Sequence, residues 1–162
     1  MNPVADSGPI ISFSRAGQVE LLRAVLPQLI VPAAVYQEVA AYGTGRPGSD
    51  LFETDPPWLT VQTLKDPALL TSIRTSLHAG EQEVLALALE LGNRPIVMDE
   101  RAGRNEARRL GIPVLTSLGV IRQARHQGLI PAARPIVESL LAHSFRLHPT
   151  VLEEYLRDLG EL

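Results

Sequence analysis

The chain has 162 residues, enough for one domain with a sizeable apolar core. Hydrophobic residues make up 45% and aromatic residues 4%, so we expect an aliphatic core without the aromatic platforms on which single-strand-binding proteins stack bases. The lack of cysteine excludes disulfides, thiolate zinc sites and cysteine nucleophiles, and it fits a reducing cytoplasm. A net charge of −3 gives no overall attraction for an anionic polymer.

The sequence carries no pattern that predicts an N-terminal signal peptide or a membrane-spanning helix. The first residues lack a basic region, and Asp6 interrupts their apolar stretch. The longest apolar run, Val84 to Leu89, is far shorter than the roughly 20 residues that cross a bilayer. We therefore expect a soluble cytoplasmic protein with no membrane partner.

The first half of the chain alternates short apolar strands with amphipathic helices. Val19, Leu22 and Val25 recur at helical spacing, and Pro27 ends that helix. The Gly- and Pro-rich stretch 43–57 predicts a loop, and its G-x-G-x-x-G spacing lacks the strand before it that a dinucleotide site needs. The patterns predict strands at 3–5, 29–31 and 58–64, and helices at 18–26, 33–41 and 68–77.

The second half continues the alternation. Gly80 predicts a break before an almost wholly apolar helix, which we expect to be buried. Gly111 is expected to cap a helix, and Pro113 favours an edge strand. The patterns predict helices at 81–91, 101–110, 118–127, 132–142 and 150–159, and strands at 95–98 and 112–115. This order predicts an α/β fold with three α/β/α layers and a mostly parallel sheet.

Four acids stand at positions where chemistry is expected. Asp6 and Asp99 each follow a short buried strand directly, and ligands bind beyond the carboxyl ends of such strands. Glu81 opens a helix, and Glu38 lies beside an apolar helical stripe, where a buried charge needs a partner. Carboxylates gathered in one pocket need a cation, and Mg²⁺ or Mn²⁺ would suit them and promote attack of water on a phosphodiester.

Each acid also has an ordinary structural interpretation. Asp6 is suited to a turn, Glu81 to the dipole of its helix, Glu38 to an ion pair with an arginine, and Asp99 to the cap of the next helix.

The segment 101–125 likewise has both a structural and a functional interpretation. It carries six arginines against the single acid Glu106, so it is either a solvated helix face or a basic surface for a phosphate backbone: Arg101, Arg104, Arg108, Arg109, Arg122 and Arg125.

At this point the residues resemble a known family. Val4-Ala5-Asp6-Ser7-Gly8-Pro9-Ile10-Ile11, followed by Val31-Pro32 and Glu38-Val39, is similar to the opening of PIN-domain proteins. Gly80-Glu81-Gln82-Glu83-Val84-Leu85-Ala86-Leu87-Ala88 and Val97-Met98-Asp99-Glu100 resemble two later parts of that family. Thr116-Ser117-Leu118-Gly119-Val120-Ile121 resembles a prokaryotic PIN-like subgroup related to VapC-type toxins.

The resemblance implies a Rossmann-like PIN-like nuclease domain over residues 1–145, with 146–162 as a helical extension packed on it. It also implies a Mg²⁺- or Mn²⁺-dependent endoribonuclease with Asp6, Glu38, Glu81 and Asp99 as catalytic metal ligands. We expect Ser7, Glu100 and Ser117 to support those ligands, and Arg101, Arg104 and Arg108 to bind RNA. Toxin relatives imply a small antitoxin partner and a homodimer.

Departures from the family pattern leave other functions open. Glu100 stands where close relatives often have Asp, and Arg101 where many have another acid. A catalytically silent module that binds protein or RNA is therefore the main alternative. A phosphotransfer domain built on Asp6 is a weaker one, because the only lysine, Lys65, is far from any predicted strand end of the right order.

Overall fold

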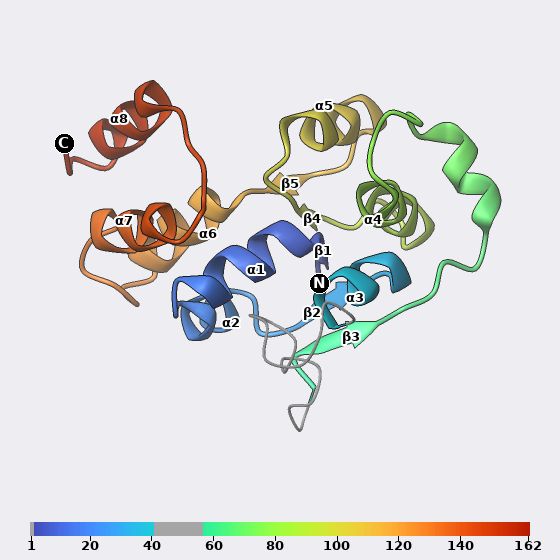
Figure 1. The fold of residues 1–162 in the computed structure, drawn as a ribbon, viewed down its shortest axis with the longest axis horizontal. Coiled ribbons are helices and arrows are strands. Elements are labelled where there is room, and N and C mark those ends of the chain that lie inside the picture. The colour runs from blue at the N-terminus through green and yellow to red at the C-terminus, as the bar shows by residue number, and fades with distance from the viewer. Residues whose placement is uncertain (1, 41–56) are drawn as a thin grey trace.

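The computed structural model describes residues 2–40 and 57–162. At its centre is a five-stranded sheet in the order β3-β2-β1-β4-β5, in which all neighbours are parallel. The strands are short: β1 (Val4–Ala5), β2 (Leu29–Val31), β3 (Leu59–Val61), β4 (Ile96–Val97) and β5 (Val114–Leu115). Helices flank the sheet in the predicted three-layer α/β/α arrangement (Figure 1).

The helices lie between the strands and, after β5, in the C-terminal part of the chain. They are α1 (Ser7–Arg15), α2 (Val19–Val25), α3 (Ala33–Ala40), the 3₁₀ helix η2 (Pro67–Ser72), α4 (Ala79–Glu90), α5 (Arg101–Leu110), α6 (Ser117–His126), α7 (Arg134–Ala142) and α8 (Pro149–Asp158). Figure 1 shows α6, α7 and α8 together at one end of the long axis, with α4 toward the other end. No helix within these described ranges is long and apolar enough to cross a membrane.

The core forms because the apolar runs are covered on all sides. The three residues of β2 are buried, and α4 packs on β1 and β4 through fully buried side chains such as Val84, Leu85 and Leu87. Burial of apolar area of this kind is the main favourable term in folding. Trp58 is buried beside it and donates its indole N–H to the Leu26 carbonyl at 2.7 Å, so it anchors the start of β3.

Three local predictions need correction. Helix α1 was not predicted, although Pro9 in its first turn is compatible with a helix. The helix expected at 68–77 is instead the short 3₁₀ helix η2, which starts at Pro67 with the Asp66 side chain as its cap. Gly80 is not a break, since α4 starts at Ala79. The loop predicted at 43–57, with its glycine spacing, lies outside the described residues except for Pro57.

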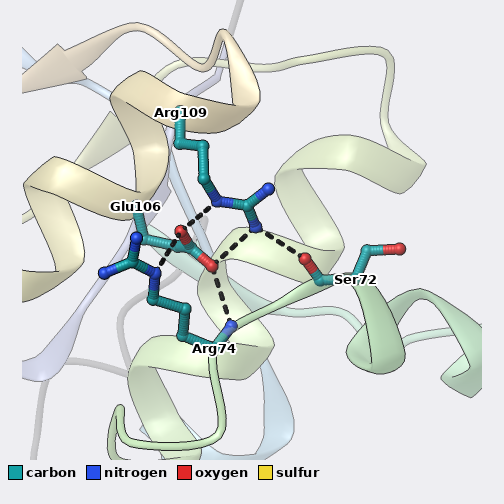
Figure 2. A network of polar contacts seen from close by, with 4 residues as sticks. All are labelled: Ser72, Arg74, Glu106 and Arg109. Atoms are coloured by element: carbon teal, nitrogen blue, oxygen red, sulfur yellow. Dashed lines mark hydrogen bonds and ion pairs between the residues drawn. The ribbon is translucent and has the colours of Figure 1, made fainter.

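One buried carboxylate fastens α5 to the segment after η2. The side chain of Glu106 is fully buried, and it accepts hydrogen bonds from the Arg109 Nε at 2.6 Å and from the Arg74 backbone N–H at 2.8 Å (Figure 2). Arg109 also donates to the Ser72 carbonyl at 2.8 Å. These bonds, those from Arg109 above all, lower the pKa of Glu106 to about 2. Arg109 thus belongs to the structural framework rather than to a free basic surface.

We predict that Glu106→Gln destabilises the protein by about 3 kcal/mol at neutral pH, because the folded state holds this carboxylate ionised. A lowered pKa stabilises the fold above the unfolded value of 4.5, and that contribution is lost as the pH falls toward about 2. Urea unfolding of both proteins from pH 7 down to pH 3 should therefore show the difference shrinking below about pH 4.5.

The matched control is Glu153→Gln, which breaks the exposed ion pair between Glu153 and Arg157 on α8. It should cost less than about 0.5 kcal/mol. Equal effects of the two substitutions would contradict the role assigned to Glu106.

Candidate active site

The sheet has a point at which its connections turn in opposite directions. The chain leaves β1 toward β2 and β3, and later leaves β4 toward β5 on the other side. Strands β1 and β4 are parallel neighbours with Val4 opposite Ile96 and Ala5 opposite Val97. In open α/β sheets the crevice outside the carboxyl ends of such strands is the usual ligand site. Asp6 and Asp99 follow these two strands, so both aspartates lie at the same edge of the sheet.

Asp6 is the buried centre of an acidic cluster. Its exposed fraction is 5%, and no ion-pair partner for it is found among residues 2–40 and 57–162. Burial, followed by the charges of Glu38, Glu81 and Asp99, raises the pKa of Asp6 from 3.8 to about 7. The Ser7 backbone N–H opposes this rise, although its geometry is not that of a helix-capping hydrogen bond. The other three predicted acids therefore lie within electrostatic range of Asp6.

Asp99 is held in place by the start of α6. Its carboxylate accepts the Ser117 backbone N–H at 2.8 Å and the Ser117 hydroxyl at 2.6 Å. It does not cap α5, whose N-cap residue is Glu100. Burial raises the pKa of Asp99, while Ser117 and the nearby Arg104 lower it in part. Ser117 is fully buried and supports Asp99 by direct contact.

Glu38 and Glu81 come from the neighbouring helices α3 and α4. Ser7 donates its hydroxyl to the Glu38 carboxylate at 2.6 Å, and Gly80 lies so close that a Cβ there would be 2.1 Å from Glu38 Oε1. Glu81 accepts the His78 backbone N–H at 3.2 Å in a capping box. Burial, rather than its neighbours Glu100 and Glu38, is the largest cause of the raised pKa of Glu81.

The four side chains are near one another but do not share a ready-made metal geometry. No group of three His, Asp or Glu side chains within the described part of the chain is close enough to hold an ion. Glu38, Glu81 and Asp99 each bond to a different neighbour instead. The donor set still suits a hard divalent cation, because every donor is a carboxylate oxygen and the buried Asp6 has no cationic partner in the described chain.

A cavity of about 380 Å³ opens beside the cluster and mixes acids with arginines. Arg101 and Arg104, which were expected to bind RNA, line it, and Glu100 lies at its wall. Arg108 lies in an adjoining hollow of about 300 Å³ that also contains Arg104. Five further lining residues, which no sequence pattern indicated, come from α1 and from the α7–α8 connection: Gly8, Ser12, Ser144, Phe145 and Arg146.

The remaining arginines of 101–125 are engaged elsewhere. Arg109 binds Glu106, Arg125 forms an ion pair with Glu161 at 3.0 Å, and Arg122 lies over the Tyr155 ring at 5.2 Å from its centroid. Of the six arginines in this segment, three lie near the cavity: Arg101, Arg104 and Arg108.

We predict that Asp6→Asn stabilises the metal-free protein at and above pH 7, by up to about 4 kcal/mol, because it removes a buried charge that its neighbours repel. A raised carboxyl pKa means that the folded state keeps a proton which the unfolded state has lost, so wild-type stability falls between about pH 4 and pH 7. Urea unfolding in chelator should show the two proteins converging near pH 4, and a constant difference across this range would contradict the acidic cluster.

Comparison with known proteins agrees with the geometry. No curated protein matches the chain. A family model described as the PIN domain matches residues 2–161, which includes the segment after residue 145. Because this match covers almost the whole chain, the protein belongs to the PIN-domain family, whose members are generally nucleases that use divalent metals.

Proposed function

We propose that this PIN domain is a Mg²⁺- or Mn²⁺-dependent endoribonuclease that hydrolyses RNA phosphodiester bonds. The observation that carries the proposal is Asp6, a buried carboxylate at the carboxyl edge of β1, in the field of three other acids. A fold that served only stability would avoid such repulsion, because an unpaired buried charge is costly. Perturbed acids in a cleft are typical of functional sites.

The ligands in this proposal are Asp6, Glu38, Glu81 and Asp99. Ser7 and Ser117 orient two of them through short hydroxyl bonds, and Glu100 adds negative charge at the wall of the cavity. A bound Mg²⁺ or Mn²⁺ supplies the Lewis acidity that activates water and stabilises an in-line displacement at phosphorus. Ion binding requires the Glu38 and Glu81 side chains to turn toward Asp6, since they are bonded elsewhere now.

The arginines give the site its attraction for a phosphate backbone. Arg101 and Arg104 line the same cavity as Asp6 and Asp99, so a phosphate placed at the acids also meets guanidinium groups. Arg104 is fixed by a hydrogen bond from its Nε to the Asp99 carbonyl at 3.1 Å. Guanidinium groups bind phosphates through paired N–H donors, and this favours binding of nucleic acid despite the net charge of −3.

The finer biological role rests on the resemblance to VapC-type proteins. On that basis we propose that the chain is the toxin of a toxin–antitoxin pair, with a small antitoxin as partner, and that it acts as a homodimer in the cytoplasm. Residues 1–145 would form the nuclease domain, with 146–162 as a helical extension packed on it.

A catalytically silent module is the alternative function. Two observations favour it: three of the acids already have hydrogen-bond donors as partners, and Arg101 stands where relatives have another acid. Such a module would bind RNA or a protein partner without metal-dependent cleavage.

We predict that the purified protein cleaves single-stranded RNA with Mn²⁺, that a chelator stops the reaction, and that Asp6→Asn lowers the rate at least about 100-fold, because it removes the central ligand. Time courses with end-labelled RNA and with DNA of the same sequence measure both the activity and the preference. Equal activity of Asp6→Asn and the parent would exclude this mechanism, and RNA binding without any cleavage would favour the silent module.

We also predict that Gly80→Ala weakens Mn²⁺ binding about tenfold while the fold persists. The added methyl group would collide with Glu38 Oε1, and this carboxylate terminates a flexible side chain that can swing away from the cluster. Isothermal titration with Mn²⁺ measures the affinity, and urea unfolding in chelator measures the stability.

Gly8→Ala is the matched control. Gly8 is the second residue of α1, as Gly80 is of α4, and a Cβ at Gly8 meets nothing within 4 Å. It should bind Mn²⁺ with the parent affinity. Equal Mn²⁺ affinity of the two variants would remove Glu38 from the proposed ligand set.

A further inference from the structure

The connection between α7 and α8 returns the chain to the acidic cavity. Helix α7 ends in a turn in which the Phe145 N–H reaches back to the Leu140 carbonyl at 3.1 Å and Ser144 has a φ of +78°. This is the geometry of a Schellman cap, in which glycine is the usual left-handed residue. The turn reverses the chain, so the side chains of Phe145 and Arg146 line the cavity together with Asp6 and Asp99.

Arg146 also lines two cavities that lie side by side. A second hollow of about 280 Å³ has Asp99, Arg104, Phe145 and Arg146 in common with the cavity of about 380 Å³. It continues along the connection to His148 and Val151. The two hollows lie between α5 with the start of α6 on one side and the α7–α8 connection on the other, and they adjoin beside the acids. Each is at the small end of ligand pockets, which suits one nucleotide at a time rather than a duplex.

The charge of Arg146 is not neutralised within the described chain. No carboxylate oxygen of residues 2–40 and 57–162 lies within ion-pair distance of it, even though the acids line the same cavity. The other arginines after Arg122 are paired: Arg125 with Glu161, Arg134 with Glu138, and Arg157 with Glu153. An exposed guanidinium without an ion-pair partner in the described chain, lining the same hollows as Arg104, provides the donors that a phosphate accepts.

We propose that Arg146 binds a backbone phosphate next to the one at the acidic cluster, so that the α7–α8 connection forms the second wall of a groove for single-stranded RNA. This inference rests on the proposed function and extends it, because it assigns substrate binding to a segment beyond the strand-end site. The groove follows the backbone with arginines from both walls, and the acids lie at one point along it. Grooves of this kind typically bind single strands through backbone charge.

The test measures RNA binding separately from cleavage. The full-length Asp6→Asn protein is titrated into a fluorescein-labelled single-stranded RNA in Ca²⁺ buffer, and anisotropy gives Kd at a series of NaCl concentrations. Adding Arg146→Ala should raise Kd about five- to tenfold and reduce the slope of log Kd against log salt by about 0.7, the value for one lost phosphate contact on a single strand. Arg146→Lys should keep most of the slope, since it retains the charge.

Arg157→Ala is the matched control, since it removes an exposed arginine of the same C-terminal segment that is paired with Glu153 and does not line the groove. It should leave Kd and slope unchanged. Equal values for Arg146→Ala and Arg157→Ala would overturn the inference even if the enzyme cleaves RNA. A slope that depends on Arg146 in a protein that cleaves nothing would support the inference while the nuclease proposal fails. Unfolding midpoints equal to the parent show that both variants are folded.

Discussion

The parallel pairing of β1 with β4 is the constraint on which the site depends. It brings together two strands separated by more than half of the chain, with Ala5 opposite Val97, so the residues that follow them emerge at one edge. Both strands are fully buried, and their pairing fixes the two aspartates at the same edge of the sheet. The repulsion between the acids is therefore built into the sheet, and the serines at positions 7 and 117 moderate it through hydroxyl bonds from their helices.

The parts of the fold that local signals determine were predictable. Gly111 takes the left-handed conformation at the end of α5, as expected for a glycine that caps a helix. Strand β5, which follows Pro113, lies at the edge of the sheet, as expected because proline cannot donate a backbone hydrogen bond. Helix α1 was missed because its local signals conflict. The proline and glycine near its start argue against a helix, so its formation depends on tertiary packing. The prediction for segment 67–72 was wrong for the opposite reason. Its apolar residues suggested an α-helix, whereas Pro67 and the Asp66 cap produce a tighter 3₁₀ helix.

The candidate site was predictable only where residues adjoin strand ends. Asp6 and Asp99 could be placed from the strand pattern, and they do lie on neighbouring strands. The sequence could not separate arginines that bind acids from those that remain available, because the partner of Arg125 is Glu161, distant in the chain. Nor could it place Arg146, whose position depends on the turn at Ser144 rather than on any motif.

In the proposed function, protons and metal ions would compete for the same oxygen atoms of Asp6, because the pKa of this carboxyl is raised. Because burial raises the pKa of this carboxyl group to about 7, binding of an ion there would displace a proton. In the proposed function, acidification would therefore lower the occupancy of the ion. The carboxyl group at the end of β1 would then make the proposed chemistry depend on the pH of the surroundings.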